Sequence, residues 1–259
     1  MKNLRIALSF LTTLPLPHPP AEAFLSGLGR AFAWYPAVGL LLGLLLTGAS
    51  WLLGQTNLSL AVQAGLLLLA WTLLTGGLHL DGVMDSCDAL FAPVSVERRL
   101  VILKDVHAGA FGVIGLFFVL GLKWALLASL LGQSSGWLAL LLAPVWGRWM
   151  LVWAAHRFPY ARRDESLGRT MTAGLSRREL LLATFFALAV QAGLGVSNLW
   201  LFSGLLALPL GHLLAVWAAG KLGDGLTGGL TGDLYGFLCE ATEVLVLLLL
   251  ALLGTANFV

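Results

Sequence analysis

Charged side chains are scarce in this sequence. Only 11% of its 259 residues are charged, against about 25% in a typical soluble domain, whereas 59% are hydrophobic. Such a chain has too few polar groups to cover the surface of a water-soluble globule, so the composition excludes that class and predicts contact with lipid. The net charge of +2 is small, and we expect no nucleic-acid partner.

Cysteine is rare as well, with Cys87 and Cys239 the two present. Neither belongs to a CxxC pair or to a Cys/His pattern with zinc-ligand spacing, which argues against a zinc site. Both are predicted on or near the face that carries the charged loops. If that face is cytoplasmic, disulfides are rare in its compartment, so both thiols are expected to be packing residues.

Long uncharged apolar runs are what the sequence does contain. Several approach or exceed the roughly 20 residues that a helix needs to cross a bilayer core. They predict an all-α, polytopic membrane bundle of about seven transmembrane helices plus an N-terminal interfacial segment, with residues 1–259 as one domain. The predicted spans are 31–53, 58–80, 108–131, 137–155, 180–196, 199–219 and 234–253.

The charges fall on one side of this predicted bilayer. All of them lie in residues 1–30, 81–107, 156–179 and 220–233, except for four inside the spans. The opposite connections and the tail after Gly254 carry no charge. Under the positive-inside rule the charged side is cytoplasmic. We therefore expect a cytoplasmic (inner) membrane protein with its active site facing the cytoplasm.

The N-terminus has two interpretations. Lys2 and Arg5 precede a short apolar run, and Ala21-Glu22-Ala23 resembles the cleavage site of a signal peptide. Four prolines between residues 15 and 20 separate the run from that site. An amphipathic segment lying at the cytoplasmic interface is the favoured interpretation.

Three carboxylates share one helical face at the end of the second span. Asp81, Asp85 and Asp88 are spaced i, i+4 and i+7, and like charges at this spacing repel one another. A divalent cation offsets such repulsion, and Mg²⁺ typically takes one or two carboxylates together with substrate phosphates. The alternative is a solvated acidic helix start, which the helix dipole favours. Three carboxylates on one face favour metal binding.

Glycine-rich turns surround this segment and a second one. Residues 75–81 and 227–233 both read T-G-G-L-x-x-D, and Asp233 ends the second. Glycine permits positive φ, so its backbone N–H groups can cradle phosphate oxygens, although small residues also pack helices together in membranes. Beside carboxylates they predict the two halves of one metal–diphosphate site. The candidate phosphate-binding glycines are Gly76, Gly77, Gly228, Gly229 and Gly232.

Four charges lie inside predicted spans: Lys123, Arg148, Glu240 and Glu243. Charge in a bilayer is unfavourable, so these residues are functional candidates, Glu240 above all because it follows the second glycine turn. The alternative is that they pair with one another and neutralise the interior of the bundle.

At these motifs the chain resembles the adenosylcobinamide-GDP ribazoletransferase (cobalamin synthase) family. Residues 75–88 are similar to its G-G-x-H-x-D-G-x-x-D-x-x-D signature, and residues 228–233 with Gly236, Glu240 and Glu243 to its last motif. Further similar segments are residues 9–15, 35–39, 104–112 and 160–168. The chain departs from the family at Ala89, where glycine is usual, and at Val106-His107, where Ser-Arg is common.

The resemblance implies a Mg²⁺-dependent transferase of cobalamin biosynthesis. A ribose hydroxyl of α-ribazole, or of its 5′-phosphate, attacks the cobinamide-side phosphorus of adenosylcobinamide-GDP and expels GMP. Positioning and charge stabilisation dominate such phosphoryl transfers. We assign metal binding to Asp81, Asp85, Asp88 and Asp233, proton acceptance to His79 or Asp88, and phosphate contacts to Lys104, Arg148 and Arg162. The partners are these substrates and the bilayer, with a homo-oligomer left open.

Two other classes remain as alternatives. Another membrane phosphoalcohol transferase or a prenyltransferase would also use clustered aspartates, but the arrangement in this chain matches their patterns only in part. An ion-coupled transporter would place charges near the bilayer midplane within broken helices. Here the acidic motifs gather at one interface, which favours interfacial catalysis.

Overall fold

The computed structural model is an all-α bundle and describes residues 2–17, 19–105, 107–133, 136–161, 167–194, 198–223 and 229–254, with backbone alone at 198–205 and 254. Its helices are α1 (Lys2–Leu11), α2 (Ala21–Ala31), the short 3₁₀ helix η1 (Phe32–Trp34), α3 (Tyr35–Leu53), α4 (Leu60–Thr75), α5 (Leu78–Phe91), α6 (Val96–Ile102), α7 (Ala110–Leu131), α8 (Gly136–Arg157), α9 (Leu167–Ala173), α10 (Arg177–Gly193), α11 (Asn198–Lys221) and α12 (Gly232–Gly254).

The all-α membrane architecture predicted from the sequence is confirmed. Four helices are long and apolar enough to cross a membrane, and a fifth span results if the bent pair α4–α5 counts as one. Six of the seven predicted spans largely overlap one helix each, namely α3, α7, α8, α10, α11 and α12. The predicted span 58–80 is instead broken between α4 and α5 at residues 76–77. Among the six, α10 has 17 residues and begins with three charged ones, so length and composition alone do not qualify it as a span.

Helix α8 is the axis of the bundle. It packs most extensively against α3 and α12, and nearly all of it is buried. Two glycines of α3 allow this close approach, because a Cβ at Gly43 would come within 2.7 Å of the Leu140 carbonyl oxygen, and Gly39 faces Pro144 in the same way. The outer helices expose large apolar side chains instead, such as Phe117 on α7 and Phe185 on α10, which suits contact with lipid.

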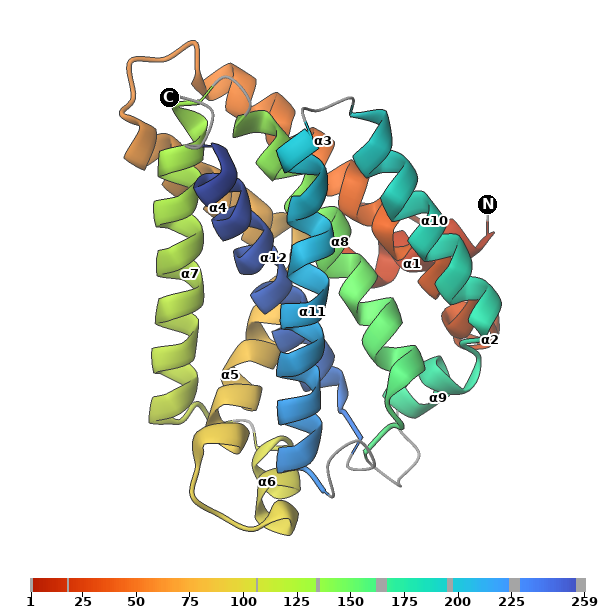
Figure 1. Ribbon diagram of the computed structural model, residues 1–259. Helices are drawn as coiled ribbons and strands as arrows, with labels where there is room; N and C mark the ends of the chain where they lie inside the picture. The colour runs from red at the N-terminus through yellow and green to blue at the C-terminus, as the bar shows by residue number, and fades with distance from the viewer. Residues whose placement is uncertain are drawn as a thin grey trace.

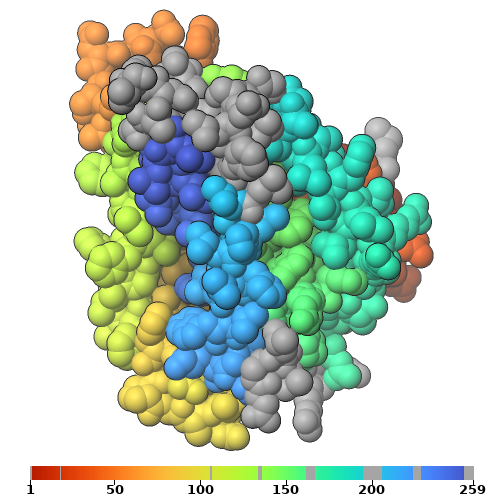
Figure 2. Space-filling model, viewed as in Figure 1, coloured from red at the N-terminus to blue at the C-terminus, as the bar shows by residue number. Residues whose placement is uncertain are grey.

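The helix ends sort onto two ends of the molecule. In Figure 1 the last turns of α3, α7, α10 and α12 lie at the upper end, where the C-terminus is marked, whereas α6 and the first turns of α7 and α12 lie at the lower end. Figure 2 shows α7 forming one flank and α11 the front face. The charged connection through α6 therefore lies at the lower end, and the uncharged connection between α3 and α4 lies at the upper end.

The N-terminal segment is an amphipathic helix packed on the bundle. Helix α1 buries Ile6, Ala7 and Leu11 against its neighbours and leaves Lys2 and Arg5 exposed. This pattern agrees with the interfacial interpretation of the segment.

A sharp break between α4 and α5 positions the candidate site. The two helices meet at 92°, and the turn consists of Gly76 (φ 63°) and Gly77 (φ 69°), a left-handed conformation that glycine adopts without strain. Their N–H groups bond the Leu73 and Thr72 carbonyls. Thr13 donates its backbone N–H to the Leu74 carbonyl at 2.9 Å and its hydroxyl to Leu73 at 2.7 Å. The N-terminal segment therefore binds carbonyl groups at the end of α4.

Candidate active site

Two cavities meet at Asp81, on the first turn of α5. The smaller has a volume of about 310 Å³ and the larger about 710 Å³, and both are lined by Phe10, Leu78 and Asp81. The larger cavity is bordered by hydroxyl groups and by the α4–α5 turn, at Thr12, Thr13, Thr72, Thr75, Gly76 and Gly77. The smaller one extends between α5 and α12 and is lined by His79, Gly82, Gly232, Asp233 and Gly236 as well.

The two T-G-G-L-x-x-D segments deliver their aspartates to the smaller cavity. Helices α5 and α12 cross so closely that a Cβ on Gly82 would lie 2.5 Å from the Asp233 carbonyl oxygen. One turn away, Gly236 faces the backbone of His79 at 3.2 Å. Asp81 and Asp233 consequently line one cavity from two helices, as the two-halves prediction requires.

The second turn is held by a short parallel β-bridge between Tyr160 and Leu230. The Leu230 N–H donates to the Pro159 carbonyl and the Ala161 N–H to the Leu230 carbonyl, both at 2.9 Å. Gly229 has a φ of 74° and lies against Pro159 and Ala161, where a side chain would collide with backbone. The segment after α8 and the segment before α12 are therefore joined at the cavity.

Asp88 faces away from the cavity toward the start of α7. One of its carboxylate oxygens accepts the Gly109 N–H at 2.7 Å, and the other accepts the Gly112 N–H at 2.8 Å. A carboxylate at this place satisfies free donors of the helix and interacts favourably with its dipole. Neither Asp88 nor Asp85 lines the two cavities.

The four predicted metal ligands thus do not form one cluster. Within the residues that the structure describes, no three His, Cys, Asp or Glu side chains are close enough to hold a metal ion. Asp81 and Asp233 face the cavity, while Asp88 is turned to α7 by its two hydrogen bonds. The arrangement offers two cavity-lining carboxylates, the number that Mg²⁺ takes when substrate phosphates complete its shell.

The predicted phosphate-binding glycines divide between the cavities. Gly76 and Gly77 line the larger one, and Gly232 lines the smaller one, with no atom within 4 Å of the position where its Cβ would stand. Gly229 packs on the β-bridge instead. Gly228 and Arg162 lie outside the described residues.

The four charges inside the bundle bind one another. Lys123 of α7 donates to Glu240 at 2.5 Å and to Glu243, and Arg148 of α8 donates to Glu243. All four side chains are at most 5% exposed. The network is formally neutral, so the charges that suggested a transporter compensate one another.

This network lies next to the cavity but does not line it. Gly236 and Leu151 border the smaller cavity, and Glu240 and Arg148 stand about one turn further along the same two helices. The Lys123 ammonium also lies 4.5 Å from the centre of the Trp71 ring. The catalytic roles predicted for Arg148 and Glu240 stay predictions, and the contacts that they make in the structure are those of ion pairing.

Lys104 follows α6 at the lower end of the molecule, exposed and lining neither cavity. Beside it, the hydrogen bond with the His107 ring holds the pKa of the exposed Asp105 carboxyl below its ordinary value. Arg99, which the motif analysis did not single out, bonds the carbonyls of Ala89, Ala92 and Lys221 and so joins α5 to α11.

Aromatic residues of the smaller cavity were missed by the motif analysis. Its lining includes Phe10, Phe32, Tyr35, Tyr160 and Tyr235. The sequence contains three tyrosines, and all three line this one cavity. Tyr35 and Tyr235 stand inside predicted apolar spans, so no polar motif points to them, and their common place follows from the packing of the helices.

Comparison with known proteins gives one family. The family of cobalamin-5-phosphate synthases matches residues 3–251. A protein of Deinococcus radiodurans named adenosylcobinamide-GDP ribazoletransferase is 44% identical, over 95% of this chain and 84% of its own length. Proteins of the same name from Herpetosiphon aurantiacus and Roseiflexus sp. are 41% and 39% identical, over 98% and 95% of this chain and 97% and 88% of their own lengths. No solved structure matches the chain.

Proposed function

Because the chain belongs to the cobalamin-5-phosphate synthase family, we propose that the two cavities meeting at Asp81 are the active site of its transfer reaction. The chain is a transferase of cobalamin biosynthesis: it moves the adenosylcobinamide phosphate of adenosylcobinamide-GDP to α-ribazole or its 5′-phosphate. The observation that carries the proposal is the meeting of Asp81 and Asp233, from two helices, at one cavity.

The reaction exchanges one phosphorus–oxygen bond for another. A ribose hydroxyl oxygen of the acceptor attacks the phosphorus that bears the cobinamide. The bond from that phosphorus to the bridging oxygen breaks, and GMP leaves with the bridging oxygen. The hydroxyl proton passes to a base. The protein therefore has to bring two substrates together, orient the hydroxyl and offset the charge of a diphosphate.

Asp81 and Asp233 are the residues that would hold Mg²⁺ at this site. Two carboxylates that face one cavity, with room for substrate phosphate oxygens, suit the coordination that Mg²⁺ takes in phosphoryl-transfer sites. When bound, the ion neutralises charge that develops on the transferred phosphoryl group and on the leaving group. The Gly76–Gly77 turn lines the larger cavity. Its N–H groups bond the Leu73 and Thr72 carbonyls, so what it offers the guanosine diphosphate is space without side chains.

His79 is the better placed of the two predicted proton acceptors. It lines the smaller cavity, and its Nδ1 atom is buried without a hydrogen-bond partner among the described residues. Asp88 uses both carboxylate oxygens to hold the start of α7. Nδ1 of His79 can therefore take the hydroxyl proton, while Asp88 keeps α7 in register with α5.

The site would open to the cytoplasm from the inner membrane. The α6 end of the bundle carries the charged connection between α5 and α7, and the opposite end carries the uncharged connection between α3 and α4. The positive-inside rule then assigns the α6 end to the cytoplasm, where nucleotide substrates are present.

The proposal is tested with purified protein in lipid nanodiscs. The wild type, given adenosylcobinamide-GDP, α-ribazole and Mg²⁺, is expected to release GMP, and chelation of the metal should stop the release. The variant Asp233→Asn is expected to lose most of the rate although it inserts and folds. Wild-type turnover in Asp233→Asn, or undiminished release in excess chelator, would remove the basis of the proposed site.

A further inference from the structure

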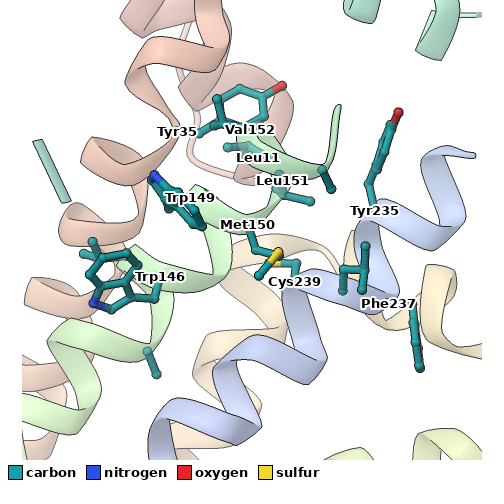
Figure 3. Packing of buried hydrophobic residues seen from close by; sticks show 14 of the residues in the cluster. Leu11, Tyr35, Trp146, Trp149, Met150, Leu151, Val152, Tyr235, Phe237 and Cys239 are labelled. Carbon is teal, nitrogen blue, oxygen red and sulfur yellow. The ribbon is translucent and has the colours of Figure 1, made fainter. Parts of the chain in front are cut away.

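The three tyrosines of the chain come from distant parts of the sequence and converge on one cavity. Tyr35 begins α3, Tyr160 follows α8, and Tyr235 lies on the first turn of α12. In Figure 3 the rings of Tyr35 and Tyr235 stand on either side of Leu151 of α8. Chance placement of every tyrosine around one space of about 310 Å³ is improbable in a bundle of this size.

Three residues that line this cavity have buried polar atoms without a partner among the described residues. The Tyr35 and Tyr235 hydroxyls and Nδ1 of His79 are buried and make no hydrogen bond within the described part of the chain. The three residues are 1%, 8% and 4% exposed. A buried polar group without a partner is unfavourable, and most such groups in proteins are paired. Three around one cavity indicate a ligand that supplies the missing partners.

The walls of the cavity are aromatic. On one side the Tyr35 ring lies 4.6 Å from the Phe32 ring and 6.5 Å from the Phe10 ring. On the other side Tyr160 and Tyr235 have ring centres 6.5 Å apart. The β-bridge to Leu230 holds the Tyr160 backbone, and the Tyr160 ring lies over Gly168 of α9. Two aromatic walls with carboxylates at one end suit a flat aromatic ring attached to a polar group.

The volume of the smaller cavity distinguishes α-ribazole from adenosylcobinamide-GDP. About 310 Å³ is near the lower end of small-molecule sites, which suits a bicyclic base with one ribose. A corrin macrocycle with its nucleotides is several times larger and does not fit. The neighbouring cavity, at about 710 Å³, is lined by threonines and the glycine turn and shares Asp81 with the first.

We infer that the aromatic cavity is the binding site of the acceptor nucleoside, with its planar base between the Tyr35 and the Tyr160–Tyr235 walls and its ribose hydroxyls directed at Asp81, Asp233 and His79. This inference rests on the proposed function. Tyr35 and Tyr235 are positioning residues that bond polar atoms of the nucleoside, and the reacting phosphorus arrives from the larger cavity at Asp81.

Filling the cavity tests the inference directly. Gly232→Leu puts a side chain into space that is empty within 4 Å and that lines the cavity. Calorimetric titration of metal-free protein with α-ribazole is expected to show an affinity at least tenfold below that of the wild type. The matched control is Gly48→Leu on α3, which also has no atom within 4 Å but lines neither cavity. It should bind α-ribazole like the wild type.

Removing single tyrosine hydroxyls tests the inference without changing the shape of the cavity. Tyr35→Phe and Tyr235→Phe each delete one unpartnered hydroxyl, so the melting temperature without ligand should stay the same or rise. The KM for α-ribazole should increase about threefold to tenfold, the loss of one hydrogen bond. The KM for adenosylcobinamide-GDP should remain within twofold. A merely structural role would lower the melting temperature and change both constants.

The outcomes separate this inference from the proposed function. If Gly232→Leu, or both phenylalanine variants, bind α-ribazole like the wild type, the aromatic cavity is not the nucleoside site, whatever the activity. If they lose adenosylcobinamide-GDP instead, the assignment of the two cavities is reversed. If the wild type binds α-ribazole but releases no GMP, the proposed function fails while the nucleoside site stands.

Discussion

Gly82 of α5 and Asp233 of α12 are in backbone contact: a Cβ on Gly82 would lie 2.5 Å from the Asp233 carbonyl oxygen. This contact fixes the separation of the two helices that contribute the cavity-lining carboxylates. The spacing of the carboxylates therefore depends on a residue that has no functional group.

Gly82→Ala is expected to impair the site by separating α5 from α12. The clash is with backbone, so a helix has to shift, and overpacking of this kind costs about 1–3 kcal/mol. A misplacement of about 1 Å in an active site can lower the rate on the order of 100-fold. GMP release and thermal melting measure the two effects. Gly48→Ala is the control, and equal activity in both variants would mean that the spacing does not matter.

Asp81→Asn and Asp233→Asn should both raise the Mg²⁺ concentration needed for half-maximal GMP release. Each removes one of two carboxylates from the cavity, and an amide is a poorer ligand for Mg²⁺ than a carboxylate. Asp85→Asn is expected to abolish turnover in a folded protein if Asp85 is also a ligand, as its helical spacing predicts. Activity near that of the wild type at saturating Mg²⁺ in Asp85→Asn would restrict the metal to the other two residues.

Asp88→Asn is expected to reduce stability more than metal affinity. The carboxylate accepts the Gly109 and Gly112 N–H groups, and an asparagine keeps one acceptor and turns an NH₂ donor toward the other group. Leaving a fully buried donor unsatisfied costs about 1–3 kcal/mol, and these donors are partly buried, so a loss near the lower end is expected. Denaturant titration should show this loss, with an unchanged half-saturating Mg²⁺ concentration. A large rise in that concentration would identify Asp88 as a ligand after all.

Lys123→Met should destabilise the bundle strongly. It leaves Glu240 and Glu243 with Arg148 as the remaining cation of the network, and breaking a buried ion pair costs about 3–5 kcal/mol. The double variant Lys123→Met/Glu240→Gln restores neutrality and should recover much of the loss in the unfolding free energy. If the double variant is no more stable than the single one, charge balance is not what the network provides.

The orientation in the membrane can be read by cysteine labelling. The native Cys87 and Cys239 are buried and should react slowly, so no cysteine-free background is needed. A thiol introduced by Glu97→Cys on α6 is expected to react only with a reagent on the cytoplasmic side. One introduced by Gln55→Cys, between α3 and α4, should react from the other side. The reverse pattern would overturn the assigned topology.

Much of the fold could be predicted because its causes are local in the sequence. Apolar runs longer than a bilayer requires specify helices such as α7 and α12. The cytoplasmic assignment of the charged connections stays a prediction. The sharp break at Gly76–Gly77 was harder to predict from the sequence, because two glycines are equally consistent with close packing of helices. Only the structure shows that both glycines adopt positive φ. It also shows that Thr13, in the N-terminal segment, donates hydrogen bonds to the Leu73 and Leu74 carbonyls just before the break.

The candidate site could be predicted in part. Helical periodicity predicted that Asp81, Asp85 and Asp88 share one face. It could not show that Asp88 bonds the start of α7, because that contact depends on where Gly109 and Gly112 lie in the fold. Shared motifs predicted that Asp233 joins Asp81, as their common cavity shows. The aromatic lining was invisible to motif spacing, because Tyr35, Tyr160 and Tyr235 come together only through tertiary packing.

The ion network has a consequence for how the chain is assembled during synthesis. Lys123 and Arg148 are translated long before Glu240 and Glu243, which follow them by about a hundred residues on the last helix of the bundle. Until α12 enters, the nascent bundle lacks the two carboxylates that these cations bind in the complete fold, and the cavity lacks Asp233 and Tyr235. Insertion of α12 neutralises the interior and completes the cavity in one event. A chain that ends before α12 lacks both carboxylates that bind Lys123 and Arg148, and charge without a partner is unfavourable in a bilayer.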